Sequence, residues 1–191
     1  FVAVFDTPFE EVATWTDGKV QAGQAEAQGE HVGAAVRFKT AKGQRVHAKV
    51  ASSFISPEQA QLNLAREVGG DSFDLTCRKA KDAWNQQLGR CDVSGGTPDQ
   101  YRNFYTALYR TMLFPRRFFE IDAGGKIVHY SPYNGKVLPG YLFTDNGFWD
   151  TFRAVFPFFT LMHRELDGQI MVGLATTVKV SACRPGGAGP G

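Results

Sequence analysis

The sequence predicts an α+β protein in which a β-rich segment comes first and helices follow. Apolar and polar residues alternate over 45–50, which is the period of a strand with one buried face. From residue 56 onward, apolar residues instead recur every three or four positions, as they do on the buried face of a helix. We therefore expect part of an antiparallel β-sandwich, followed by a set of helices.

Residues 1–55 are predicted to form about four short strands of an incomplete antiparallel sheet. A strand over 12–16 precedes an Asp-Gly turn. Residues 31–39 and 45–50 are expected to pair as a hairpin, because the loop at 41–44 contains a glycine that permits a left-handed backbone. Short strands joined by glycine turns at this spacing are typical of a sandwich.

Three helices are predicted next, and two of them begin with the same capping pattern. Ser56 and Thr97 are each followed by a proline and, three positions after the cap, by a glutamine. Glycine or proline marks the end of each helix. A short strand is expected over 90–93, between the second helix and the third. The helices themselves are expected over residues 57–68, 73–88 and 98–114.

The segment 116–147 is predicted to be a long irregular excursion, because glycine and proline turns interrupt it repeatedly. Ordered loops of about 30 residues are unusual and tend to be functional. A fourth helix is expected from about Phe148, with a kink or break at Pro157. Of the 25 aromatic residues, 17 fall between 101 and 159, so this block builds either a large core or a cleft on which sugars stack.

Composition excludes several classes of protein. The chain has 191 residues with 21 Lys and Arg against 19 Asp and Glu, and a net charge of +2 argues against binding nucleic acid through bulk charge. No apolar run approaches the roughly 20 residues of a transmembrane helix. Three cysteines match neither a closed disulfide set nor a zinc pattern. The chain opens without Met or a signal peptide, and we expect it to be a fragment.

The strongest candidate site lies where a turn delivers Trp149, Asp150 and Arg153 onto the start of a helix. Backbone N–H groups and the helix dipole favour the ionised form of a carboxylate there. Such a carboxylate accepts hydrogen bonds from two neighbouring sugar hydroxyls, while an adjacent indole stacks on the sugar face. Arg153 is expected to hold Asp150 through a forked ion pair. On spacing alone, a helix cap beside a core Trp and a structural ion pair is the favoured interpretation.

Four segments of the chain form a recognisable set: SFISPEQA at 53–60, YTALYRTMLFPR at 105–116, YSPYNGKV at 130–137 and WDTFR at 149–153. Together they resemble glycoside hydrolase family 92, the calcium-dependent exo-α-mannosidases. The resemblance extends over about residues 1–174, and the motifs occur in the family's order.

The resemblance implies a specific domain organisation. Residues 1–55 would be the end of an N-terminal β-sandwich, 56–96 a helical linker, and 97–175 the opening helices of an (α/α)6 catalytic barrel. Residues 176–191 would then be a disordered or frameshifted tail rich in Gly and Pro, because the family continues with an aromatic-rich segment at this point. The chain also carries Arg110 where family members usually have His.

The resemblance further implies an enzyme that hydrolyses terminal mannose from glycans with inversion, with α-1,2 as the favoured linkage and calcium as the cofactor. It implies a secreted or periplasmic location. Asp150 maps onto a carboxylate that binds mannose hydroxyls, with Trp149 and Arg153 as its neighbours. His129 is a weaker candidate that would reach a sugar from a loop.

Inverting hydrolysis needs an acid and a base about 6.5–9.5 Å apart. The family resemblance places both, and most calcium ligands, in a later part of the barrel, so we assign no catalytic residue and no metal ligand to this chain. Two pairs are weaker substitutes, Asp145 with Asp150 and Glu120 with Asp122. Two other functions stay open: a non-catalytic sugar-binding or interaction module, and a different (α/α)6 glycosidase.

Overall fold

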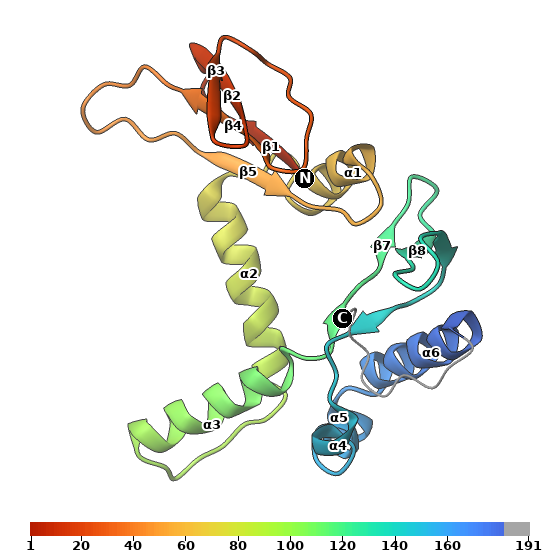
Figure 1. The fold of residues 1–191 in the computed structure, drawn as a ribbon. Helices are drawn as coiled ribbons and strands as arrows, with labels where there is room; N and C mark the ends of the chain where they lie inside the picture. Colours follow the sequence, from red (N-terminus) through yellow and green to blue (C-terminus); the bar gives the residue numbers. More distant parts are fainter. Residues whose placement is uncertain (182–191) are drawn as a thin grey trace. The chain divides into compact units, whose positions relative to one another are not determined.

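The computed structural model describes residues 1–181 (Figure 1). Contacts divide the chain into two compact units, Val2–Val50 and a second unit that begins at Ala51 and also includes Phe1. Antiparallel sheets come first and long helices follow, which confirms the α+β class. Within the described residues, no helix is both long and apolar enough to cross a membrane.

Two small sheets make up the N-terminal unit. The first has the order β3-β2-β4 and is antiparallel throughout. The second pairs β1 with β5. The strands are β1 (Val2–Phe5), β2 (Glu11–Thr16), β3 (Lys19–Ala22), β4 (Val32–Arg37) and β5 (Ala48–Ala51).

The predicted hairpin between 31–39 and 45–50 is wrong. Both segments contain strands, but β4 pairs with β2 and β5 pairs with β1. Asp6 accounts for part of the second pairing, because its backbone N–H donates to the His47 carbonyl over 3.1 Å. The Asp6 carboxylate also accepts the backbone N–H of His47 at 3.0 Å and lies 2.7 Å from Nδ1 of its ring. Alternation identifies a strand, whereas its partner is chosen by contacts distant in sequence.

The three predicted helices are present, and their caps form as expected. They are α1 (Pro57–Glu67), α2 (Phe73–Leu88) and α3 (Pro98–Thr111). Ser56 accepts the backbone N–H of Gln59, and Thr97 forms a complete capping box with Gln100. The strand predicted at 90–93 is absent. The chain there bends after α2, and the carbonyl of Cys91 accepts the Tyr105 hydroxyl at 3.0 Å rather than a strand neighbour.

The segment 116–147 is more regular than the sequence predicts. It contains five short strands, of which β7, β8 and β9 form an antiparallel sheet while β6 pairs with β10. Each strand is only two to four residues long, so no periodicity signals it. The strands are β6 (Arg116–Arg117), β7 (Glu120–Ile121), β8 (Ile127–Tyr130), β9 (Val137–Pro139) and β10 (Phe143–Thr144).

Three helices complete the described chain: α4 (Phe148–Thr151), α5 (Val155–Met162) and α6 (Arg164–Ser181). The predicted kink or break at Pro157 is wrong, because the helix that begins at Phe148 already ends before the turn at 152–154. Pro157 occupies the first turn of α5, where a missing N–H costs no helical hydrogen bond.

The C-terminal boundary differs from the sequence-based one. Helix α6 continues to Ser181, so residues 176–181 are helical and the abrupt change predicted at residue 176 does not end the helix. The rest of the predicted tail, 182–191, lies outside the described residues.

The core of the second unit forms where α5, α6 and β10 meet. Phe143, Phe159 and Ile170 are almost fully buried there, and half-buried apolar side chains from the surrounding elements pack on them. Gly173 on α6 permits the close approach of β10, because a Cβ at this position would lie 3.0 Å from the Phe143 ring. This core supports the segment that carries the candidate site.

Candidate functional site

The turn before α4 is held by polar contacts on both sides. Asp145 adopts a left-handed backbone with φ of 60°, and its carboxylate accepts the Thr144 hydroxyl at 3.2 Å and pairs with Arg116. Asn146 is buried, and its Oδ1 accepts the Thr151 hydroxyl at 3.1 Å. The turn therefore enters α4 in a fixed geometry, although Gly147, the N-cap residue, offers no capping side chain.

Trp149 and Asp150 project from α4 toward solvent. The Trp149 side chain is 79% exposed, which is unusual for so large an apolar group. Asp150 lies in the first helical turn and is exposed. Within residues 1–181, its carboxylate has no hydrogen-bond or ion-pair partner, so it stays available to a ligand. An open indole beside an open carboxylate offers a stacking face and an acceptor of two hydroxyl hydrogen bonds.

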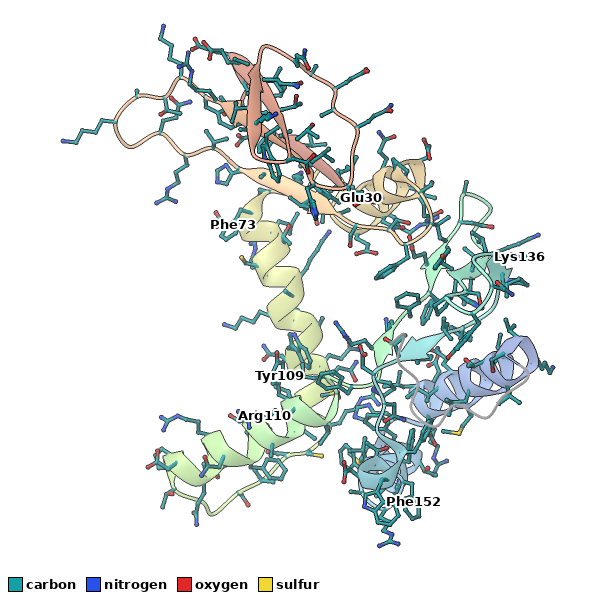
Figure 2. All side chains as sticks on the ribbon, viewed as in Figure 1. Glu30, Phe73, Tyr109, Arg110, Lys136 and Phe152 are labelled. Atoms are coloured by element: carbon teal, nitrogen blue, oxygen red, sulfur yellow. The ribbon has the colours of Figure 1, made fainter. Side chains whose placement is uncertain are left out.

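Arg153 does not form the expected forked pair with Asp150. Its guanidinium carbon instead lies 4.9 Å from the centroid of the Phe152 ring and 5.8 Å from that of Trp149. Figure 2 shows Phe152 at the outer end of this region. A planar, weakly hydrated guanidinium stacks well on exposed rings, and this contact leaves Asp150 without an ion-pair partner in the described part of the chain. Phe152 is half exposed and therefore belongs to the same surface as Trp149. The only indication of this role in the sequence is its position next to Arg153.

His129 lies on strand β8, not on a loop, and its side chain is 2% exposed. Its Nδ1 lies 2.8 Å from the Gly140 carbonyl oxygen, which fixes the ring toward the interior. The structure therefore does not bring His129 to the exposed surface of Trp149 and Asp150.

The alternative carboxylates are engaged within the fold. Glu120 accepts the Ser53 hydroxyl and the Phe54 backbone N–H at 3.0 Å each, and the Asn63 amide at 2.6 Å. Asp122 accepts the backbone N–H of Lys126 at 2.8 Å, closing the turn between β7 and β8. A carboxylate saturated by fixed donors is poorly placed to exchange protons with a substrate.

The acidic residues do not fit a calcium site in the described part of the chain. No group of three or more His, Cys, Asp or Glu side chains converges there in a way that would hold a metal ion. Calcium takes six to eight oxygen ligands, which a lone Asp150 does not approach.

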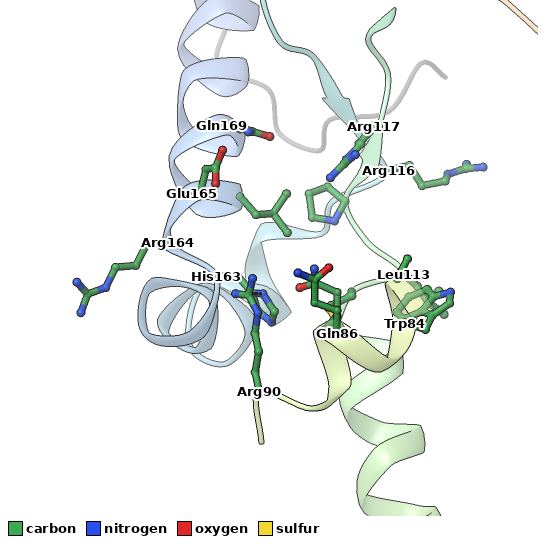
Figure 3. A pocket seen from close by; sticks show the side chains of 15 residues that line it. Trp84, Gln86, Arg90, Leu113, Arg116, Arg117, His163, Arg164, Glu165 and Gln169 are labelled. Atoms are coloured by element: carbon green, nitrogen blue, oxygen red, sulfur yellow. Dashed lines mark hydrogen bonds between the residues drawn. The ribbon is translucent and has the colours of Figure 1, made fainter. Parts of the chain in front are cut away.

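A cavity of about 910 Å³ lies between the end of α2, strand β6 and the start of α6 (Figure 3). Its charged lining is mostly basic, with Arg90, Arg116, Arg117 and Arg164 against Glu165. His163 also lines it, and no motif in the sequence singles this side chain out.

His163 is 6% exposed, and its Nδ1 lies 3.2 Å from a guanidinium nitrogen of Arg90. Burial lowers the pKa of His163, and the positive charge of Arg90 lowers it further. The ring is therefore held neutral. Because Arg90 has only donors, Nδ1 must accept and the ring proton must sit on Nε2.

Family models match both parts of the chain. The glycosyl hydrolase family 92 catalytic domain matches residues 59–189, and the N-terminal domain of the same family matches residues 1–53. The exposed Trp149 and Asp150 lie within the first of these matches.

Solved structures are similar over almost all of the chain. An inverting mannosidase of family 92 from Bacteroides thetaiotaomicron VPI-5482 has a TM-score of 0.94 and 42% identity, covering 99% of this chain and 26% of that one. The family 92 glycosyl hydrolase ccman5 has a TM-score of 0.72 and covers 94% of this chain and 24% of that one. Its identity is 24%, so that likeness concerns the fold.

A curated protein from Arthroderma benhamiae, described as an uncharacterized secreted glycosidase, is 37% identical over 78 residues. That alignment covers 39% of this chain and 10% of the fungal protein. The chain thus spans about a quarter of the length of the solved family members it resembles. With family models matching both of its parts, the chain belongs to glycoside hydrolase family 92.

Proposed function

We propose that this chain supplies part of the mannose-binding site of an inverting exo-α-mannosidase. The full enzyme would remove terminal mannose from glycans, with calcium as its cofactor and α-1,2 as the favoured linkage. The observation that carries the proposal is the carboxylate of Asp150, which has no partner among residues 1–181, beside the open indole of Trp149. The 42% identity to an inverting mannosidase over 99% of the chain supports the choice of sugar and stereochemistry.

Asp150 would accept hydrogen bonds from two adjacent hydroxyls of the terminal mannose. Trp149 would stack on the apolar face of the same ring, and Arg153 would order the indole by lying over it. Hydrogen bonds to a charged acceptor are worth about 1.5–3 kcal/mol each, so Asp150 is expected to contribute most of the affinity.

Hydrolysis would need groups outside the described residues. Glu120 and Asp145 are engaged by donors within the fold, which supports placing the acid, the base and the calcium ligands elsewhere in the barrel. The isolated chain would bind mannose without cleaving it, and activity would require the further barrel segment. Secretion is proposed from the fungal relative that is described as secreted.

The engaged carboxylates also favour a second candidate, a non-catalytic mannose-binding module. The two functions agree on binding and differ on cleavage. Incubation of a full-length version with an α-linked mannoside and calcium separates them, because only the enzyme releases β-mannose as the first product. Release of a different sugar would refute the proposed substrate.

The binding site itself is tested by titrating the chain with methyl α-mannoside and with its C2 epimer, methyl α-glucoside. We expect Asp150→Asn to weaken mannoside binding about tenfold or more, because the amide accepts fewer and weaker hydrogen bonds. Asp74→Asn is the matched control, since Asp74 is also an exposed acid in a first helical turn. Equal affinities for the wild type and both variants would refute the role of Asp150.

A further inference from the structure

The segment 145–163 carries Trp149 and Asp150, and an arginine from a different element holds each of its ends. At the start, Arg116 of β6 pairs with Asp145. At the end, Arg90, just after α2, donates to the carbonyl oxygen of Met162 over 2.7 Å. The sequence between these anchors contains the whole exposed surface of the candidate site.

The contact made by Arg90 is well matched to the end of α5. Met162 is the last residue of this helix, so its carbonyl lacks an intrahelical partner and lies at the negative end of the helix dipole. A guanidinium nearby satisfies the carbonyl and complements the dipole. The same nitrogen lies 3.2 Å from Nδ1 of His163, the residue at which the chain turns into α6.

The two anchors differ in what they contact. Arg116 and Asp145 form a pair whose side chains are 67% and 30% exposed, and pairs so open to water contribute little. Arg90 is also an exposed residue, but its guanidinium contacts the buried imidazole of His163 and the carbonyl at the end of α5. Figure 3 shows the Arg90 side chain directed at His163 along one side of the cavity, whereas Arg164, which also lines the cavity, points away from His163.

We propose that Arg90 is a positioning residue for the sugar site, because it fixes the end of the helix that follows Trp149 and Asp150. This inference rests on the proposed sugar-binding role of those two residues. Loss of Arg90 leaves the Met162 carbonyl and the buried Nδ1 of His163 without this donor. The end of α5 then loosens, and the exposed surface at the beginning of the segment samples more orientations.

The first test is hydrogen exchange measured on the 191-residue chain. In Arg90→Gln, we expect the helical amides of 158–163 to exchange at least about tenfold faster, the factor for a lost charge-assisted hydrogen bond at the low end of its usual strength. Arg164→Gln is the control, because it removes one positive charge from the same cavity without a contact to His163. Unchanged exchange in Arg90→Gln, or equal acceleration in both variants, would overturn the proposal.

Arg90→Lys addresses the case in which the Gln variant fails to fold. Lysine keeps the charge but lacks the rigid fork, so one ammonium holds the carbonyl and the imidazole less well. We expect faster exchange of the amides of 158–163, with the amides of α1 unchanged. Wild-type exchange throughout would refute the need for the guanidinium.

Affinity and a spectroscopic signal distinguish positioning from mere stability. Well below the melting temperature, we expect Arg90→Gln to weaken methyl α-mannoside binding several-fold and to change the ¹⁵N chemical shift of His163 Nδ1, while Arg164→Gln changes neither. Wild-type affinity in Arg90→Gln would refute positioning. If the wild type binds no mannoside, the proposed function fails, whereas the exchange experiment still decides whether Arg90 anchors α5.

Discussion

Glu120 offers a sharp test of whether a carboxylate in the aromatic block is structural or catalytic. Its side chain accepts hydrogen bonds from Ser53, Phe54 and Asn63, and so joins β7 to the segment that leads into α1. Because the site is only half buried, we take about 1 kcal/mol for each hydrogen bond, below the range for fully buried charged ones. Glu120→Ala should therefore lower the free energy of unfolding by about 3 kcal/mol.

The assay is urea unfolding followed by far-ultraviolet circular dichroism, with the slope of the transition checked for constancy. Glu120→Gln should lower the free energy of unfolding by less than Glu120→Ala does. Its amide oxygen still accepts hydrogen bonds, whereas its amide nitrogen faces other donors and makes none. Asp122→Asn is a useful control, since Asp122 accepts a single hydrogen bond within its own turn. A Glu120→Ala chain as stable as the wild type would refute the structural role of Glu120. In a full-length enzyme, loss of hydrolysis without loss of stability would restore a catalytic role.

Three further predictions concern packing and pH. Phe159→Ala should cost about 3–5 kcal/mol by urea unfolding, whereas Leu161→Ala on the same helix should change stability by less than about 0.5 kcal/mol, because the two side chains are 0% and 71% exposed. Gly33→Ala should disrupt the first sheet, detectable as a changed Trp15 fluorescence, because a Cβ there would lie 2.4 Å from the indole ring. Because folding lowers the pKa of His163, the unfolded chain binds a proton at this residue more readily than the folded chain does. The stability that the neutral His163 ring contributes is therefore complete above about pH 6.5 and is lost as the pH falls through the folded-state pKa. His163→Gln should flatten the pH dependence of the unfolding midpoint in that window, and an unchanged slope would contradict the assignment.

Local signals in the sequence predicted local structure well. The caps at Ser56 and Thr97 form as expected, because a capping side chain reaches only three residues along the chain. The strands near 31–39 and 45–50 exist, but their partners were assigned incorrectly because pairing depends on residues far away in sequence. The two-residue strands β6, β7 and β10 escaped prediction altogether, since no period can be read from two residues.

In the candidate site, too, the grouping of residues close in sequence was predictable and their contacts were not. Trp149, Asp150 and Arg153 are close in sequence, and a single helical turn suffices to predict that they share a surface. The contact partner of Arg153 could not be predicted from the sequence. Whether it pairs with Asp150 or stacks on two aromatic rings depends on how exposed these groups are, and the spacing of residues does not determine exposure.

The two arginines that anchor the site could not be predicted from the sequence at all. Arg116 acts on Asp145 across a pair of two-residue strands, and Arg90 acts on a helix end more than 70 positions later. Neither arginine lies in a sequence motif that predicts its partner. A turn with an uncapped N-terminus and a four-residue helix has little intrinsic stability. Contacts from distant residues therefore help to hold its exposed aromatic and carboxylate groups for a ligand. Substitution of Arg90, which contacts the buried His163 and the end of α5, should affect binding before it affects the fold.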